Sequence, residues 1–313
     1  MNICAHWIFM ALFLGGVACA GAAENDATPP RQLQNLVDRA AQKTLEQFSD
    51  KKLSSNQLAI TVINLSRSNA PIRASFRGDA SVYPASVVKL FYLVATHEWL
   101  AHGKLQDTPE LRRALRDMIV ESYNEATHYI VDLLTDTTSG PELSKAELGQ
   151  WLYKRDAVNR YFSAAGYTNI NANKKPWCEG PYGREVQAVK SYQPTRNALT
   201  TDSTARLLAD IVLGDAVSRP RSAEMMKLLE RDPFSPGGDP EDQARGFSGA
   251  AVPRTGRLWS KAGWTSETRH DAAYIELANG VRFVIVVFTT GHSNERGVIP
   301  FVVRQMVENL PPE

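Results

Sequence analysis

The sequence predicts an α/β protein of the α+β type, with an antiparallel five-stranded sheet flanked by terminal helices and a mostly helical inserted lobe. Strand-like stretches occur near both ends of the chain, over residues 58–78 and 257–290, whereas the middle has helical spacing. Because exposed strands need partners, both ends are expected to form one sheet, with the insert as a second lobe. The predicted sheet domain takes residues 28–80 and 250–313, and the helical domain takes residues 81–249.

The N-terminus is predicted to be an export signal over residues 1–23. Ile8 to Ala20 is an apolar run too short to span a bilayer, and small residues follow it. We therefore expect a secreted or periplasmic protein, without stable membrane insertion after cleavage. Two alternatives stay open, a lipid anchor on Cys19 and a buried N-terminal helix.

Composition excludes several classes of function. The chain has 35 basic and 34 acidic residues, and this balance argues against nucleic acid as a partner. Neither CxxC nor HExxH occurs and the six histidines are scattered, so neither a metal site nor a cofactor is expected. Signal cleavage would leave Cys178 alone, without an internal disulfide. We expect a monomer acting on a small-molecule or short peptide substrate.

The predicted elements follow from local patterns. Thr28-Pro29-Pro30 is typical of a helix start, and apolar spacing continues to Phe48. Residues 58–65 and 72–78 are predicted to pair as strands around a turn at residues 68–71. Helices are expected over residues 86–102, 109–123, 124–134 and 201–213. The polar segment 168–199 is expected to be an Ω-like loop, either functional or disordered. The chain should end with strands at 257–264, 272–278 and 281–290 and a helix at 298–310, with Asn279-Gly280 as a hairpin turn.

The first candidate for chemistry is the stretch from Tyr83 to Thr96, which is apolar except for Lys89. A buried amine is costly unless something uses or neutralises it. Ser86 and Lys89 lie three residues apart and hence on one helix face, where a lysine with a lowered pKa can accept the hydroxyl proton. The pattern predicts an activated serine at a helix N-terminus, whose free N–H groups suit an oxyanion. The alternative is a lysine whose amine reaches solvent near a chance serine.

Two further motifs are candidates for the same site. Ser122 and Asn124 lie at a predicted helix junction, where Ser122 could relay a proton and Asn124 could hold a substrate amide. Helix capping is the alternative for both residues. Lys261 and Gly263 end a predicted strand, where the lysine supplies positive charge and the glycine permits close approach of a substrate. An ordinary edge-strand lysine is the alternative there.

In this order, S-x-x-K, S-x-N and K-x-G resemble the motif set of the penicillin-recognising serine acylases, namely class A β-lactamases and penicillin-binding proteins. The segments 196–212, 244–264 and 269–290 are also similar to segments of that family. The resemblance implies that Ser86 is the nucleophile, Lys89 its base or relay, and Ser122 the donor to the leaving nitrogen. It also implies that Asn124 and Lys261 bind substrate, with an oxyanion hole from the backbone N–H groups of Ser86 and Trp264.

Three departures from the family pattern concern substrate binding and deacylation. Tyr123 stands where the family has an acidic residue, and Ala262 replaces a hydroxyl residue. The loop lacks the E-x-x-L-N pattern whose glutamate activates water. Glu185 stands at about the right distance before Arg196 to take that role, and Glu179 is the second candidate. Pairing of either carboxylate with a nearby basic residue is the alternative.

Three functions are compatible with this sequence. The first is a β-lactamase-like hydrolase that opens β-lactam amides through an acyl-Ser86 intermediate. The second is a D-Ala-D-Ala peptidase, a penicillin-binding protein or another serine amidase or esterase with slow deacylation, acting on a peptidoglycan-like peptide. The third is a catalytically silent module that binds peptidoglycan.

Overall fold

The computed structural model describes residues 29–66, 70–176, 180–191, 195–236, 239 and 242–311. The predicted export signal, Cys19, Cys178 and Glu179 lie outside the described residues. Among the helices of the described ranges, none is long and apolar enough to cross a membrane.

One antiparallel sheet of six strands, ordered β2-β1-β6-β5-β4-β3, joins the two ends of the chain within the described ranges. The strands are β1 (Leu58–Asn64), β2 (Ile72–Phe76), β3 (Glu230–Arg231), β4 (Arg257–Trp264), β5 (Thr268–Glu276) and β6 (Arg282–Thr290). The predicted fold class is therefore confirmed, with one strand more than expected. The additional strand, β3, has two residues and is too short to show an alternating pattern.

Strand β5 begins earlier than its sequence suggested. The prediction began it at Ala272, but pairing with β4 and β6 already starts at Thr268. The three intervening residues, Arg269 to Asp271, are polar and yet at most 5% exposed. Polar character concealed the strand because these side chains are buried through specific partners, which a hydropathy pattern cannot reveal.

Ten α-helices and short 3₁₀ turns make up most of the remainder of the described chain. The α-helices are α1 (Pro29–Gln47), α2 (Lys89–Ala101), α3 (Pro109–Ile119), α4 (Asn124–Thr135), α5 (Lys145–Arg155), α6 (Ala157–Ala164), α7 (Arg184–Ser191), α8 (Thr201–Leu213), α9 (Arg219–Leu229) and α10 (Val298–Asn309). Four of them, α5, α6, α7 and α9, were not expected from the sequence. Helix α7 lies inside the segment predicted to be a loop without regular structure.

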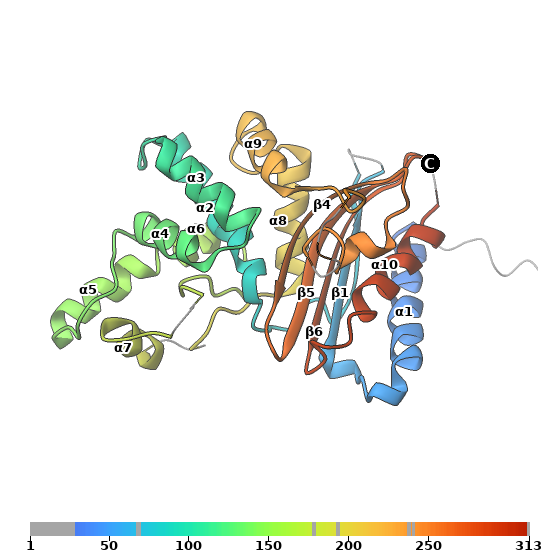
Figure 1. Ribbon diagram of the computed structural model, residues 1–313, viewed down its shortest axis with the longest axis horizontal. Helices are drawn as coiled ribbons and strands as arrows, with labels where there is room; N and C mark the ends of the chain where they lie inside the picture. The colour runs from blue at the N-terminus through green and yellow to red at the C-terminus, as the bar shows by residue number, and fades with distance from the viewer. Residues whose placement is uncertain are drawn as a thin grey trace, which may run out of the picture.

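The helices pack in two groups around the sheet (Figure 1). Helices α1 and α10 cover one face, and α8 covers the other face against β1 and β6. Two clusters of buried apolar side chains correspond to these faces, and the cluster under α8 continues into α2, α3 and α4. The helices from α3 to α7 extend away from the sheet as a lobe, as Figure 1 shows. Helix α2 lies within the core, because every side chain from Lys89 to His97 is buried.

A buried ionic cluster holds α7 against this lobe. The carboxylate of Glu185 on α7 accepts hydrogen bonds from Arg155 of α5 at 2.8 and 3.2 Å, and one from Ser139 at 2.9 Å. The Lys175 amine donates to Asp132 of α4 at 2.7 Å and lies 3.6 Å from Glu185. Glu185 is 2% exposed and Arg155 is 1% exposed, so this pairing is shielded from solvent. The cluster therefore joins α4, α5 and α7 through charge.

Replacing Arg155 by Met is expected to lower the free energy of unfolding by about 3 kcal/mol or more, because Glu185 would stay buried without its main partner. The double variant Arg155→Met/Glu185→Gln should lose less free energy of unfolding than Arg155→Met, because no unpaired carboxylate is left buried. The exposed pair of Arg113 and Glu110 offers a control, since Arg113→Met should change stability by less than about 1 kcal/mol. Urea denaturation measures all three. A double variant as unstable as Arg155→Met would contradict the pairing.

Candidate active site

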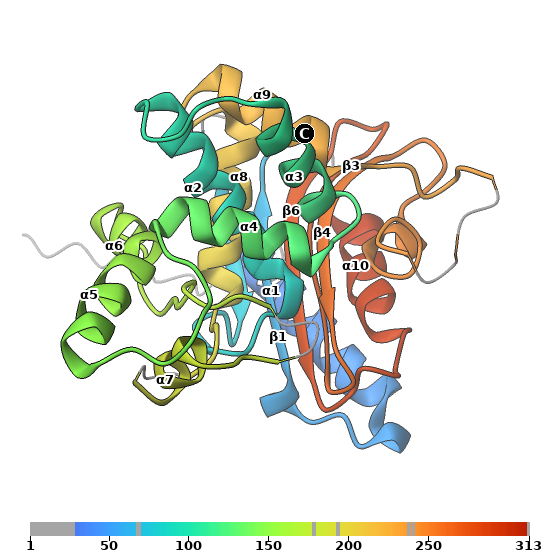
Figure 2. The ribbon, with the colours of Figure 1, turned by 60° about the vertical axis from the view of Figure 1, so that its left-hand side comes forward.

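Ser86 lies in a short 3₁₀ turn, η3 (Ala85–Val88), which leads directly into α2. The serine is half-buried, while Ala85 before it has a left-handed backbone with φ of 46°. The turn is closed by the amide of Val87, which donates to the carbonyl of Pro84 at 3.1 Å. Such backbone geometry is costly for a residue with a side chain and is concentrated at functional sites. Figure 2 shows the lobe from α4 to α7 beside strands β4 and β6 of the sheet.

The Lys89 amine is fully buried and is held by the junction between α3 and α4. It donates to the backbone carbonyl of Ser122 at 2.6 Å, to the Ser122 hydroxyl at 3.2 Å and to the Asn124 side-chain oxygen at 2.9 Å. These acceptors offset the cost of removing the amine from water. The structure thus brings Lys89, Ser122 and Asn124 together, although they come from two separate motifs.

Ser122 has a left-handed backbone, with φ of 61°, at the point where α3 has ended and α4 is about to begin. For a residue other than glycine this conformation costs on the order of 1 kcal/mol. In this conformation both the carbonyl and the hydroxyl of Ser122 accept from Lys89. The strained backbone therefore gives Lys89 two acceptors from one residue.

Lys261, near the end of β4, approaches the same hydroxyl from the sheet. Its fully buried amine donates to the Ser122 hydroxyl at 2.9 Å and to the Ala262 carbonyl at 2.7 Å. Burial lowers the pKa of Lys261 well below its ordinary value, and the nearby charges of Lys89 and Arg231 lower it further. The Ser122 hydroxyl thus contacts two buried amines, a geometry in which it can pass a proton to or from either one.

Gln243 completes this network and was missed by the sequence reasoning. Its side-chain oxygen accepts from the Lys261 amine and from the Ala262 amide, the latter at 3.2 Å. Its side-chain nitrogen donates to the carbonyl of Val120 at 2.9 Å, two residues before Ser122. Gln243 therefore ties β4 to the end of α3. No pattern marks this glutamine, because it comes from a loop and acts only through tertiary contacts.

Gly263 brings β4 against the turn that carries Ser86. A β-carbon built on Gly263 would lie 2.6 Å from the Ser86 backbone nitrogen and 2.8 Å from both the Pro84 carbonyl oxygen and the Val87 nitrogen. Side chains do not tolerate contacts of that length with backbone atoms. Glycine is required here for close approach of two segments of the protein, whereas the sequence suggested close approach of substrate.

His270 supports this turn from the neighbouring strand and was also missed. It pairs with Gly263 in the β4–β5 register, and its ring is fully buried against Phe288. The Thr289 amide donates to Nδ1 at 3.1 Å, so Nε2 carries the proton that it donates to the Tyr83 carbonyl at 2.9 Å. Burial lowers the pKa of His270 to about 4, which keeps the imidazole neutral. The ring therefore fixes the backbone three residues before Ser86.

The remaining predicted residues lie in different surroundings. Trp264 is 47% exposed with its ring against Phe247, and Tyr123 between the two motif residues Ser122 and Asn124 is 56% exposed. The Glu185 carboxylate is held by Arg155 and Ser139, and within the described ranges its bonds reach neither Ser86 nor Lys89. The prediction that Glu185 activates water therefore receives no support from its contacts. The second candidate, Glu179, lies outside the described residues.

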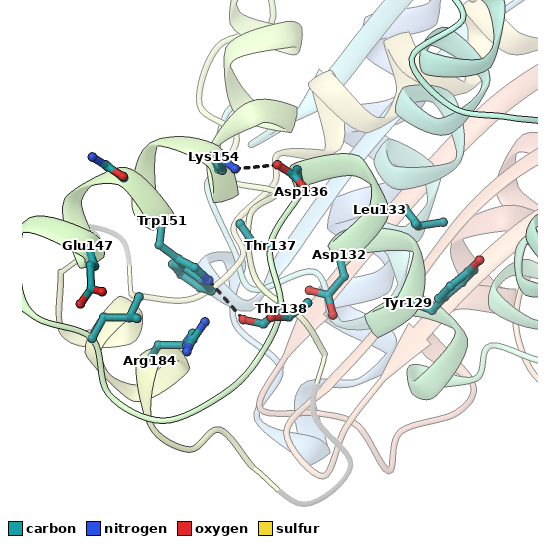
Figure 3. A pocket seen from close by; sticks show the side chains of 12 residues that line it. Tyr129, Asp132, Leu133, Asp136, Thr137, Thr138, Glu147, Trp151, Lys154 and Arg184 are labelled. Carbon is teal, nitrogen blue, oxygen red and sulfur yellow. Dashed lines mark hydrogen bonds and ion pairs between the residues drawn. The ribbon is translucent and has the colours of Figure 1, made fainter.

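A large hollow of the described surface, of about 720 Å³, lies among α4, α5 and the start of α7 (Figure 3). The Trp151 indole N–H donates to the Thr138 carbonyl at 3.2 Å there, and Lys154 pairs with Asp136 at 2.6 Å. None of the residues predicted to act in catalysis or substrate binding lines this hollow. Its size alone does not make it the reactive site, because it lacks the serine and both buried amines.

Comparisons with known proteins agree on one family. The profile of the beta-lactamase enzyme family matches residues 39–303. A beta-lactamase from Sphaerobacter thermophilus is similar in structure, with a TM-score of 0.62 at 18% identity, covering 89% of this chain and 99% of its own. A beta-lactamase from Xanthomonas campestris has a TM-score of 0.62 at 13% identity, and the match again covers 89% of this chain and 99% of its own. A PBP-A variant in an acyl-enzyme complex with penicillin G has a TM-score of 0.61 at 19% identity. That match covers 88% of this chain and 96% of the PBP-A chain. None of the curated proteins matches the chain in sequence.

The His270 geometry predicts a stability loss in mild acid. The ordinary pKa of a histidine, 6.5, applies to the unfolded chain, and the folded value is about 4, so only the unfolded chain gains this proton between those values. Neutral His270 therefore contributes on the order of 3 kcal/mol to the free energy of unfolding above pH 6.5. This contribution is lost as the pH falls to about 4. Urea denaturation from pH 7 to pH 4.5 should show a weaker pH dependence for His270→Asn than for the unmodified protein. Equal pH dependence would contradict the prediction.

Proposed function

Because the chain belongs to the beta-lactamase enzyme family, we propose that it is a serine hydrolase that opens β-lactam amides through an acyl-Ser86 intermediate. The observation that carries the proposal is the Ser122 hydroxyl, which lies within hydrogen-bonding distance of the buried amines of Lys89 and Lys261. Both amines lie in elements that contact the Ser86 turn, since α2 continues it and β4 packs on it. An isolated lysine near a chance serine would not require this convergence.

In the proposed acylation, Lys89 in its neutral form accepts the proton of the Ser86 hydroxyl as the oxygen attacks the amide carbon. The backbone N–H groups of Ser86 and Trp264 donate to the developing oxyanion. The amide C–N bond then breaks, and Ser122 donates its proton to the leaving nitrogen. Lys89, which took the proton from Ser86, returns it to Ser122 through their contact at 3.2 Å. The products are a serine ester and a free amine, so the proton taken from Ser86 ends on nitrogen.

Substrate binding is proposed for the groups around this pair. Lys261 provides positive charge suited to the carboxylate of a β-lactam or of a peptide terminus, and Asn124 provides an amide. Tyr123 and Trp264 are exposed next to the catalytic motifs, where their rings can contact an apolar substituent of the substrate. Ala262 offers no hydroxyl, so one hydrogen bond to a bound carboxylate is absent. Secretion or a periplasmic location would bring the enzyme to such substrates.

Deacylation separates this function from a second one, in which the acyl-enzyme persists as in a penicillin-binding protein. The engagement of Glu185 with Arg155 favours the second function, because its carboxylate is already committed to the ionic cluster. Without a general base for water, proton transfer is slower by about 10²–10⁴-fold. The structural similarity to PBP-A agrees with either function, since that protein's variant is known as an acyl-enzyme.

A chromogenic cephalosporin, combined with intact-mass measurement, tests the proposal. Steady turnover would support the hydrolase, and a single burst with a lasting adduct would support the penicillin-binding alternative. Ser86→Ala should give neither adduct nor turnover. Lys89→Ala should give a folded protein without measurable acylation, because the proton acceptor is lost. Unchanged acylation in Lys89→Ala would refute the role of Lys89, and no adduct on the unmodified protein would favour the non-catalytic module.

Gly263→Ala should slow acylation by about 100-fold, because the added methyl group must displace the backbone at Ser86. Gly149→Ala is the matched control, since a β-carbon there meets no atom within 4 Å. The control should keep the acylation rate and gain about 0.5–1 kcal/mol in stability as a helical alanine. The acylation rates of both variants are measured by intact mass over a time course with penicillin. Equal rates in both variants would show that the contact does not position Ser86.

A further inference from the structure

A second cavity, of about 310 Å³, lies where the C-terminal half of α2 meets α3 and α9. Its walls include His97 and Leu100 of α2, Leu115 of α3 and Leu228 of α9. Lys89 lies eight residues before His97 on α2, which corresponds to about 12 Å along the helix axis. None of the residues proposed for acylation lines this cavity, so it is separate from the serine site.

His97 points to a ligand in this cavity. Its side chain is almost fully buried, yet within the described structure neither ring nitrogen has a hydrogen-bond partner. The nearest carboxylate oxygen, on Glu224, lies 3.5 Å from Nδ1, beyond the usual range of an N–H···O bond. Burial lowers the pKa of His97 to about 4, so the ring is neutral and offers one N–H donor and one acceptor. Buried polar groups normally have partners, and a bound molecule would provide them.

The charges around the cavity select the ligand. Arg112 donates to Asp107 at 2.7 and 2.8 Å, and Arg221 pairs with Glu224 at 2.9 Å, so both carboxylates are already neutralised. Lys227 also lines the cavity and has no such partner within the described ranges. Three cationic groups thus face two anionic ones, which leaves a net positive charge for an anion.

From these observations we propose that this cavity binds a small monocarboxylate with an apolar body. The carboxylate accepts from the His97 N–H and from the Lys227 amine, which closes in from the rim. The apolar body packs against Leu100, Leu115 and Leu228. A cavity of this volume is at the lower end of the range for small-molecule sites, which favours a single ring or a short chain.

Benzoate is the probe, with benzamide as its neutral counterpart, and the Ser86→Ala protein serves as the background that excludes covalent chemistry. NMR signals of the His97 imidazole should shift saturably with benzoate. The His97 pKa should rise from about 4 on binding, because an adjacent anion stabilises the imidazolium. Benzamide should bind at least about tenfold more weakly, since it lacks the charge that Lys227 recognises.

Variants distinguish specific binding of benzoate in this cavity from nonspecific binding elsewhere. Lys227 lies on the surface, so Lys227→Gln should keep the fold while lowering the affinity for benzoate by about tenfold. His97→Phe should abolish saturable binding, and replacement of the exposed His102, directly after the end of α2, by Gln should leave it unchanged. The proposal is overturned by an unshifted His97 signal at millimolar benzoate, which would mean that water alone occupies the cavity. It is also overturned by equal affinity for benzamide, or by an unchanged affinity in Lys227→Gln.

Discussion

The buried amine of Lys89 is the constraint on which the site depends. An amine without solvent requires acceptors, and the junction of α3 and α4 provides three of them. The junction must therefore stay against the N-terminal end of α2, and Ser122 must keep its left-handed backbone to present two of the acceptors. The same requirement places the Ser122 hydroxyl where Lys261 reaches it from the sheet. One buried amine thus links a helix, a helix junction and a strand.

The sheet provides a fixed support for the turn that carries Ser86. Strand β4 contacts the Ser86 turn through Gly263, and β5 holds the same turn through the ring of His270. Both contacts are made to backbone atoms, so they position the turn irrespective of the side chains it carries. The neutral state of His270 is essential to this arrangement, because a second ring proton would remove the acceptor for the Thr289 amide. A rigid strand pair is well suited to this task, since its register is fixed by interstrand hydrogen bonds.

The outer part of the lobe is held by other means. Arg155, Lys175, Asp132 and Glu185 join α4, α5 and α7 through buried charges rather than through a large apolar core. The Glu185 carboxylate in this cluster accepts hydrogen bonds from Arg155 and Ser139. Its role as the base that activates water stays a prediction. Sequence position does not determine which partners a loop carboxylate meets.

The sequence by itself determined the α+β class, the strands at both chain ends and both end residues of helix α8. It also identified the three motifs whose side chains are the candidates for chemistry. These features depend on local periodicity, on turn chemistry such as Asn279-Gly280, and on residue types at short spacing. Only the tertiary structure decided that Lys89 and Lys261 share the Ser122 hydroxyl, that Gln243 and His270 support them, and that Glu185 pairs with Arg155. It also revealed β3, the polar start of β5 and helix α7. Each of these depends on partners distant in the chain, because buried polar groups are specified by the atoms that satisfy them and not by their neighbours in sequence.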